Sequence, residues 1–252
     1  MTKTKLKPVD IIAPLVTFFL LFMLWEAIVK INDIPRWLLP SPSSIVVVMF
    51  TKFDLFAPHL LITFQTVLIG FAIAVPVGVL IAALITNFRL VNDSLSPYVI
   101  LLVTTPLITL VPLLMLWMGY GIEVRIVTVV IQSFAIVNLN ACTGFMNVPI
   151  IRLELMQSLG ANRIQTFFRV ILPTAAVDVF TGIRLAAIFA TTACITSEYV
   201  GGNMGLGSQI IKHSQFLKTT ESFACIFFVA VVGITMYVLI TFIEKKVVSW
   251  KI

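Results

Sequence analysis

Six apolar runs, each long enough to cross a lipid bilayer, limit what this chain of 252 residues can fold into. They lie at approximately 11–29, 61–86, 98–119, 126–146, 175–197 and 223–243. About 20 apolar residues in an α-helix cross the hydrocarbon layer, and a helix satisfies its own backbone polar groups there. Charged residues make up 11% of the chain, about half the fraction of a soluble domain. We therefore predict an all-α integral membrane protein with about six transmembrane helices.

The first 60 residues combine an anchor helix with a segment at the membrane surface. The run at 11–29 exceeds the apolar core of a secretory signal peptide, so we expect a retained anchor. The stretch "LLPSPSSIVVVMF" at 38–50 is too short to cross the bilayer. We predict a short interfacial helix there, with Ser43 or Ser44 as its N-cap. Residues 61–252 then form the membrane core.

The distribution of basic residues predicts the orientation. If both termini lie in the cytoplasm, the cytoplasmic segments hold ten lysines and arginines and the outer segments hold six. Cytoplasmic loops of membrane proteins carry this excess, so we predict N-in and C-in topology, with residues 198–222 outside. The net charge of +6 is then explained by anionic lipid at the cytoplasmic face, without nucleic acid. Glu198 opens a glycine-rich outer segment. It could contact a partner protein or gate an outer opening, but we expect a solvated carboxylate.

The sequence supports no catalytic or metal centre. Cys142, Cys194 and Cys225 lie inside apolar runs without CxxC spacing, so we interpret them as small buried hydrophobic residues. His59 and His213 are isolated. The sequence holds no Walker A, HExxH or GxSxG pattern. We therefore expect no catalytic residue, no metal site and no cofactor bound by this chain.

Residues 147–173 form an amphipathic stretch between two apolar runs. Pro149 is suited to the start of a helix and Gly160 to its end. Asn162 followed by Gln165 has the spacing of a capping box for a second helix. We predict two short amphipathic helices joined at Gly160. One interpretation is a segment that rests on the lipid headgroups with its arginines at phosphates.

A second interpretation comes from the spacing of individual residues in this stretch. Glu154, Gly160 and the pair Leu172–Pro173 are spaced as in the EAA loop of ATP-binding-cassette (ABC) importer permeases. In that loop, Glu-Ala-Ala is followed after three residues by Gly and after nine more by an apolar residue, one further residue and Leu-Pro. Leu155 and Met156 replace the two alanines here.

The resemblance extends over most of the chain. The segments "HLLITFQTVLIGFAIAVPVG", "TTPLITLVPLLMLWMGYG", "LPTAAVDVFTGIRLA" and "SEYVGGNMGLG" resemble permeases of the nitrate/sulfonate/taurine type. Two positions depart from the pattern: Thr66 stands where many relatives carry a basic residue, and Val177 where a second proline is common.

The resemblance implies a function and a set of partners. The chain would be the permease subunit of an ABC importer in the cell membrane, with a permease core at 61–252 and a coupling loop at 147–173. Two copies would form a homodimer with two cytoplasmic ATP-binding subunits, which hold ATP and Mg, and an extracellular or periplasmic substrate-binding protein. The solute would be a nitrate-, sulfonate- or taurine-like anion or a heterocyclic vitamin precursor. The residues implied to couple to the ATPase are Glu154, Leu155, Met156, Gly160, Ala161, Phe167, Phe168 and Pro173.

Polar side chains inside the apolar runs are candidates for the solute pathway, although most such groups tie helices together. The candidates are Thr104, Thr105, Gln132, Asn138, Thr192 and Arg184. Arg184 has two interpretations: it binds an anionic solute, or it satisfies helix-end carbonyls near the cytoplasmic face. We favour the second.

Two other classes of function make different demands on the sequence. An ion-coupled secondary transporter predicts inverted repeats with acidic residues at the bilayer midplane. An integral membrane enzyme predicts His, Asp or Glu clustered at one depth. Neither pattern is evident in this sequence, so the importer permease is the leading hypothesis.

Overall fold

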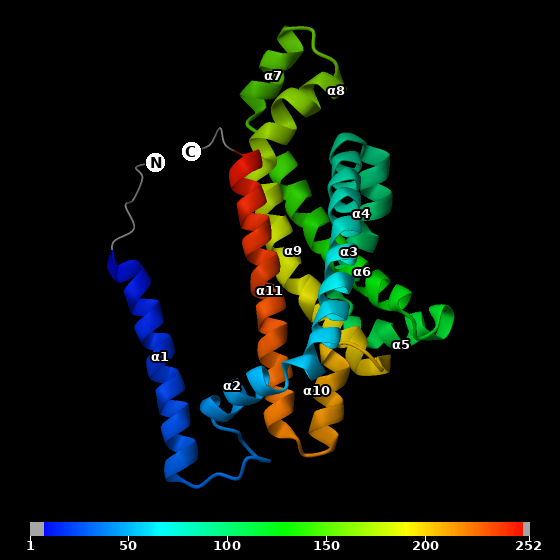
Figure 1. The fold of residues 1–252 in the computed structure, drawn as a ribbon. Coiled ribbons are helices and arrows are strands. Elements are labelled where there is room, and N and C mark those ends of the chain that lie inside the picture. Colours follow the sequence, from blue (N-terminus) through cyan, green and yellow to red (C-terminus); the bar gives the residue numbers. More distant parts are fainter. Residues whose placement is uncertain (1–7, 249–252) are drawn as a thin grey trace.

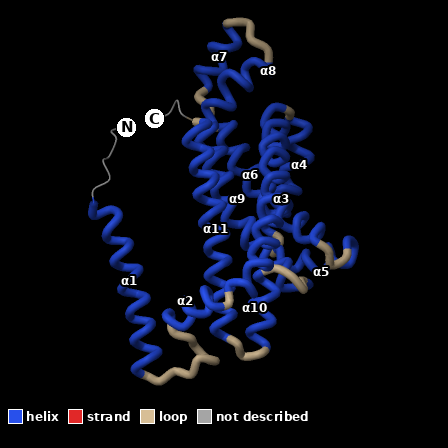
Figure 2. The backbone as a smooth tube through the Cα atoms, viewed as in Figure 1, coloured by secondary structure: helices blue, strands red, loops and turns tan. Residues whose placement is uncertain are grey.

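The computed structural model describes residues 8–248, which are helical with short connections and contain no strand within that range (Figures 1 and 2). The helices are α1 (Pro8–Ile31), α2 (Pro42–Thr51), α3 (Phe53–Asn87), α4 (Arg89–Thr104), α5 (Leu107–Met118), α6 (Ile122–Met146), α7 (Ile150–Ser158), α8 (Arg163–Thr166), the π-helical turn η1 (Phe167–Ile171), α9 (Leu172–Gly201), α10 (Leu206–Gln215) and α11 (Thr219–Val247). Lys3, Lys5, Lys7 and Lys251, which enter the count of basic residues, lie outside the described residues.

Five segments are long and apolar enough to cross a membrane: α1, α3, α6, the continuous stretch from α8 through α9, and α11. The pair α4 and α5 supplies a sixth crossing if it is counted as one span. The prediction of an all-α membrane protein with about six spans is therefore confirmed.

The sixth crossing is broken. α4 and α5 meet at an angle of 105°, and Figure 1 shows α5 running sideways from the end of α4. A proline disfavours α-helical geometry at the residue before it, and Thr105 accordingly has a ψ of 123° ahead of Pro106. The apolar run at 98–119 thus forms two arms that meet at Thr105 and Pro106.

The core is built on α3, α6 and α9, with α6 packed extensively against each of the other two. Lipid tails are as apolar as side chains, so helices in a membrane associate through tight packing and small residues. Gly70 provides this contact between α3 and α6: a Cβ there would lie 2.7 Å from the Cβ of Val129. Gly182 does the same on α9, where a Cβ would collide with Asn140 of α6. These glycines bring the three helices together.

The predicted interfacial helix is α2, but its N-cap was wrongly assigned to Ser43 or Ser44. Ser41 is the N-cap, and its Oγ accepts a hydrogen bond from the Ser44 backbone N–H at 3.4 Å. Pro42 occupies the first helical turn, where the N–H that proline lacks would have had no partner. The N-cap of α2 is therefore Ser41, the residue before Pro42.

The two ends of the bundle differ. The connection through α7 and α8 lies at the same end as the turn between α3 and α4 and the end of α11 (Figure 1). α2 and α10 lie at the opposite end. The fold thus places the amphipathic segment 147–173 and the glycine-rich segment after α9 at opposite ends of the molecule.

Candidate functional site

The amphipathic segment forms the two short helices that the sequence predicts. Helix α7 ends at Ser158 with Leu159 as its C-cap, and Gly160 follows with a φ of 71°, in the left-handed region that favours glycine. The N–H of Gly160 donates to the Gln157 carbonyl and the N–H of Ala161 to the Met156 carbonyl, both at 3.0 Å, which is a Schellman cap. The predicted capping box at Asn162 and Gln165 is also present, with hydrogen bonds of 2.8 and 3.0 Å.

Helix α8 continues into α9 through the π-helical turn η1. Proline at position 173 has no N–H for the carbonyl of Arg169, and in an α-helix its ring would collide with that carbonyl. The chain instead widens, and the N–H of Leu172 donates to the carbonyl of Phe167, five residues earlier. Pro173 thus sets the wide turn through which α8 joins the spanning helix α9.

The segment presents apolar side chains at the end of the bundle. Leu155 is 59% exposed and Phe168 is 62% exposed, and Glu154 and Gly160 are also exposed. Phe167 differs from Phe168, because its ring turns inward and packs edge to face on Phe145 at 5.3 Å. Met156, Ala161 and Pro173 are half-buried. The residues implied to couple to an ATPase therefore divide into an exposed set and a set that holds the segment on the bundle.

A cavity of about 290 Å³ lies at the break between α4 and α5, against α6 and α9. Four of the six pathway candidates line it: Thr104, Thr105, Gln132 and Thr192. Phe189 and Thr196 of α9 complete its polar and aromatic wall. The proline break therefore brings together residues from three regions of the sequence.

Toward a ligand, three threonine hydroxyls of this cavity can act only as acceptors, because their O–H groups already donate within the protein. Thr105 Oγ1 donates to the Leu101 carbonyl at 2.7 Å, and Thr104 and Thr196 likewise donate to carbonyls of their own helices. Their oxygen lone pairs remain available to a ligand. The amide of Gln132 and the hydroxyl of Thr192 form no side-chain hydrogen bond within residues 8–248, so they can both donate and accept. None of the described lining residues is charged, so the cavity offers neutral hydrogen-bonding groups beside an aromatic ring.

The other two pathway candidates lie outside this cavity lining. Asn138 is buried, and its Nδ2 donates to the Gly78 carbonyl of α3 at 3.1 Å. Arg184 pairs with Glu244 of α11, with Nη1 and Oε2 3.0 Å apart, and donates to Thr181 Oγ1 at 3.2 Å. Both side chains join helices, and the partner of Arg184 is a carboxylate where helix-end carbonyls were expected.

The ion pair of Arg184 leads to a testable expectation for stability. Arg184→Ala leaves Glu244, whose side chain is only 16% exposed, without its cation, and should lower the free energy of unfolding by roughly 1–3 kcal/mol. Arg184→Lys should retain most of the stability, because lysine keeps the charge. Thermal unfolding in detergent measures both changes. A loss of solute-stimulated ATPase activity in Arg184→Lys, at normal stability and assembly, would instead place Arg184 in the solute pathway.

A second polar cluster, which sequence reasoning missed, centres on Glu198. Its side chain is fully buried at the end of α9. Oε1 accepts a hydrogen bond from Thr63 Oγ1 at 2.8 Å, and Oε2 accepts one from the Gly207 N–H at 2.7 Å. Thr63 Oγ1 also accepts from the Leu206 N–H at 2.9 Å. The carboxylate therefore fastens the start of α10 to α3 and α9.

The segment between α9 and α10 is held from two more directions. Arg125 Nη1 donates to the Met204 carbonyl at 2.9 Å, and the Gly205 N–H donates to His59 Nδ1 at 3.1 Å. Gly205 has a φ of 102°, and a Cβ there would collide with the Glu198 carboxylate. The expectation of a solvated Glu198 was wrong, because the segment folds back over the carboxylate. An acid at the end of an apolar run, followed by glycines, was the signal for such a site.

Comparisons with known proteins agree with this architecture. The family model described as "Binding-protein-dependent transport system inner membrane component" matches residues 74–249. The chain is 28% identical over 239 residues to the formylaminopyrimidine transport permease protein ThiX of Halalkalibacterium halodurans, covering 94% of this chain and 95% of that protein. It is 27% identical over 238 residues to the riboflavin transport system permease protein RibX of Chloroflexus aurantiacus, covering 94% and 89%.

A solved structure shares the fold. It is described as an amino acid ABC transporter with histidines, and it aligns with a TM-score of 0.65 at 20% identity, covering 79% of this chain and 97% of that chain. The family match spans well over half of the sequence and includes α6 to α11. The chain therefore belongs to the inner membrane components of binding-protein-dependent transport systems, the permease subunits of ABC importers.

Proposed function

We propose that two copies of this chain form the translocation pathway of an importer for a small polar solute. Two cytoplasmic ATP-binding subunits would drive it, and an external binding protein would deliver the solute. The chain itself is a transport subunit of the membrane and no enzyme. The observation that carries the proposal is the cavity at the α4–α5 break, which gathers four of the pathway candidates.

The homodimer is supported by the surface around that cavity. Phe189 is 44% exposed, so the cavity opens to one side of the single chain. Leu116 and Trp117 on α5 are 78% and 72% exposed. A second copy against α5 would cover this apolar surface and close the cavity between the two chains.

The coupling role of α7 and α8 is supported by their position and composition. They project from one end of the bundle, and their exposed apolar residues have no partner within residues 8–248 (Figure 1). The stretch from α8 through η1 to α9 is continuous. A displacement of α8 by an ATPase subunit would therefore pass directly to α9, which lines the cavity. Alternating access would follow from tilting of these helices.

The cavity is tested with conservative variants in a reconstituted complex with its ATPase subunits and binding protein. Gln132→Leu and Thr192→Val keep the side-chain volume and remove hydrogen-bonding groups. Each should lower solute uptake about fivefold to tenfold, since a net hydrogen bond contributes about 1 kcal/mol. Thr235→Val on α11 is the matched control, because that hydroxyl only bonds to its own helix. Wild-type uptake by both cavity variants at normal assembly would refute the proposal.

The same reconstituted complex is used to determine the solute class. The cavity is lined by hydroxyls, an amide and a phenyl ring, which suits a neutral heterocycle. The same lining also suits an anion whose charge is balanced elsewhere. A formylaminopyrimidine and taurine serve as the two probes. Selective stimulation of ATP hydrolysis by the pyrimidine identifies the heterocycle class, and selective stimulation by taurine identifies the sulfonates.

We also propose that α7 and α8 lie in the cytoplasm and that α10 lies outside. The excess of basic residues and the shared location of α7, α8 and the end of α11 support this orientation (Figure 1). Lys212 on α10 is exposed and suits a single cysteine for labelling. An impermeant thiol reagent should modify Lys212→Cys from outside and Gln157→Cys only after the membrane is opened. The reverse pattern would overturn the topology.

A further inference from the structure

A second cavity, of about 580 Å³, lies between the end of α1, the α1–α2 connection, α2 with its C-cap, and the first turn of α11. Its lining includes three basic side chains and several hydroxyls: Lys30, Arg36, Lys52, Ser41, Ser44 and Thr220. We refer to it as the basic cavity. It lies at the end of the bundle opposite α7 and α8, and it shares no lining residue with the cavity at the α4–α5 break (Figure 1).

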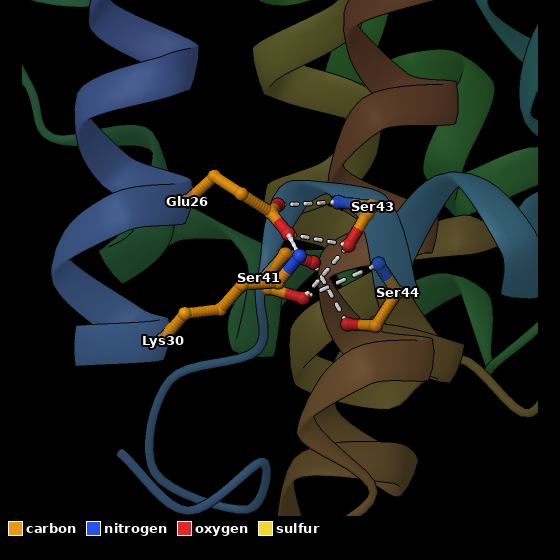
Figure 3. A network of polar contacts seen from close by, with 5 residues as sticks. All are labelled: Glu26, Lys30, Ser41, Ser43 and Ser44. Carbon is orange, nitrogen blue, oxygen red and sulfur yellow. Dashed lines mark hydrogen bonds and ion pairs between the residues drawn. The ribbon is translucent and has the colours of Figure 1, made fainter. Parts of the chain in front are cut away.

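A network of polar contacts gives the basic cavity its shape (Figure 3). The Glu26 carboxylate of α1 accepts hydrogen bonds from the backbone N–H of Ser43 at 2.9 Å and from Ser43 Oγ at 2.6 Å. The same carboxylate pairs with Lys30 Nζ at 2.8 Å. Glu26 thus ties α1 to the first turn of α2 and holds Lys30 beside the serines of that turn. These hydrogen bonds and this ion pair fix the position of the α1 side of the cavity relative to α2.

The charges around the basic cavity do not balance. Lys30 is paired with Glu26, and Lys52 is paired with Glu221 at 2.7 Å. Each ammonium has three N–H donors, so one carboxylate leaves donors free. Arg36 forms no ion pair with any acid in the part of the chain that the structure describes, and its guanidinium offers five N–H donors. Three cations therefore face two carboxylates, and the cavity lacks one negative charge.

The surroundings of the basic cavity are those of a membrane surface. α1 is a membrane-spanning helix, and among its side chains from residue 12 to 31 only Val29 is buried. The cavity lies at the end of this apolar span, which is the level of the lipid headgroups. Val47 and Phe50 on α2 are 58% and 79% exposed, and Trp37 is 57% exposed, as is common for tryptophan at a membrane surface. Acyl chains beside α1 and α2 would bring a headgroup to the basic cavity.

We propose that the basic cavity binds the phosphodiester of an anionic glycerophospholipid. The single negative charge of the phosphate meets the unbalanced positive charge at Arg36, with Lys30 and Lys52 as further donors. The remaining lone pair of Ser41 Oγ and the hydroxyl of Thr220 suit a polyhydroxyl headgroup such as glycerol. The lipid would fill the angle between α1 and α2 and fasten α1 to the bundle. α1 reaches α11 through aromatic contacts near this end, including Trp25 with Phe223 at 5.8 Å between ring centroids.

The experiment measures lipid binding to the purified full chain in detergent by native mass spectrometry. Phosphatidylglycerol is the anionic probe, phosphatidylcholine the zwitterionic probe, and glycerol 3-phosphate the soluble anion. The wild type should prefer phosphatidylglycerol over both. Arg36→Gln should weaken phosphatidylglycerol binding about fivefold, and Arg36→Gln with Lys30→Gln about 30-fold, since each basic residue near an anionic headgroup contributes comparably. Phosphatidylcholine binding should not change.

The matched control is Lys245→Gln with Lys246→Gln, which removes two charges at the far end of α11. This pair should leave phosphatidylglycerol binding at the wild-type level. Arg36 and Lys30 are exposed, so unfolding should not obscure the result, and circular dichroism checks this directly. Equal binding of the two lipids, an equal loss in the control pair, or glycerol 3-phosphate binding as tight as phosphatidylglycerol would each overturn the proposal.

Discussion

Gly160→Trp is expected to leave the chain inserted in the membrane and to weaken its association with the ATPase subunits about 30-fold, the loss typical of a central interface residue. Within the described structure a Cβ at this position meets no atom within 4 Å, so a side chain has room in the isolated chain. A large ring would collide only with a protein docked on α7 and α8. Co-purification of the ATPase subunits and uptake by vesicles measure the effect.

The control for Gly160→Trp separates backbone strain from the docking clash. Gly160→Ala is that control, because it carries the same cost for left-handed geometry, about 1–2 kcal/mol, with a methyl group in place of the ring. A Cβ at Gly160 meets no atom within 4 Å, so the methyl group should leave the proposed docking surface nearly unchanged. If both variants, or neither, lose the ATPase subunits, the proposed docking clash at Gly160 is refuted.

Glu198→Ala is expected to be among the most destabilising single substitutions in this protein. It removes the acceptor for the Gly207 N–H and for the Thr63 O–H, and both donors are then buried without an acceptor. An unsatisfied buried donor costs about 1–3 kcal/mol, so two together should lower the free energy of unfolding by roughly 2–5 kcal/mol. Thermal unfolding in detergent, followed by circular dichroism, measures the loss.

Two further variants define the origin of that effect. Glu198→Gln keeps the shape but places an N–H₂ group against one of the two donors, so its stability should lie between the wild type and Glu198→Ala. Glu123→Gln on α6 removes an exposed carboxylate and should change stability by less than about 0.5 kcal/mol. Wild-type stability of Glu198→Ala would show that water replaces the carboxylate, and the cluster would then not hold the segment between α9 and α10.

The features predicted correctly from the sequence are those set by local chemistry. An apolar run of sufficient length is a membrane helix whatever surrounds it, and the spans at α3, α6, α9 and α11 follow from this rule. The caps of α7 and α8 depend on residues within five positions of one another, such as Asn162 and Gln165. The same applies to the resemblance to the EAA loop, because its pattern is a spacing along one segment.

The features that the sequence left open depend on residues far apart in the chain. Thr63 and Glu198 are separated by 135 positions, and Arg125 and Met204 by 79, so no local pattern shows that they meet. Likewise Thr104, Gln132 and Thr192 were candidates among many polar groups in the membrane until the break at Pro106 placed them around one cavity. A polar group in lipid must find a partner, but its identity depends on helix rotation and tilt, which close packing at residues such as Gly70 decides. By itself the sequence determined the class of protein and its spans, and the tertiary structure decided which polar side chains face one another, since packing between helices sets their rotation.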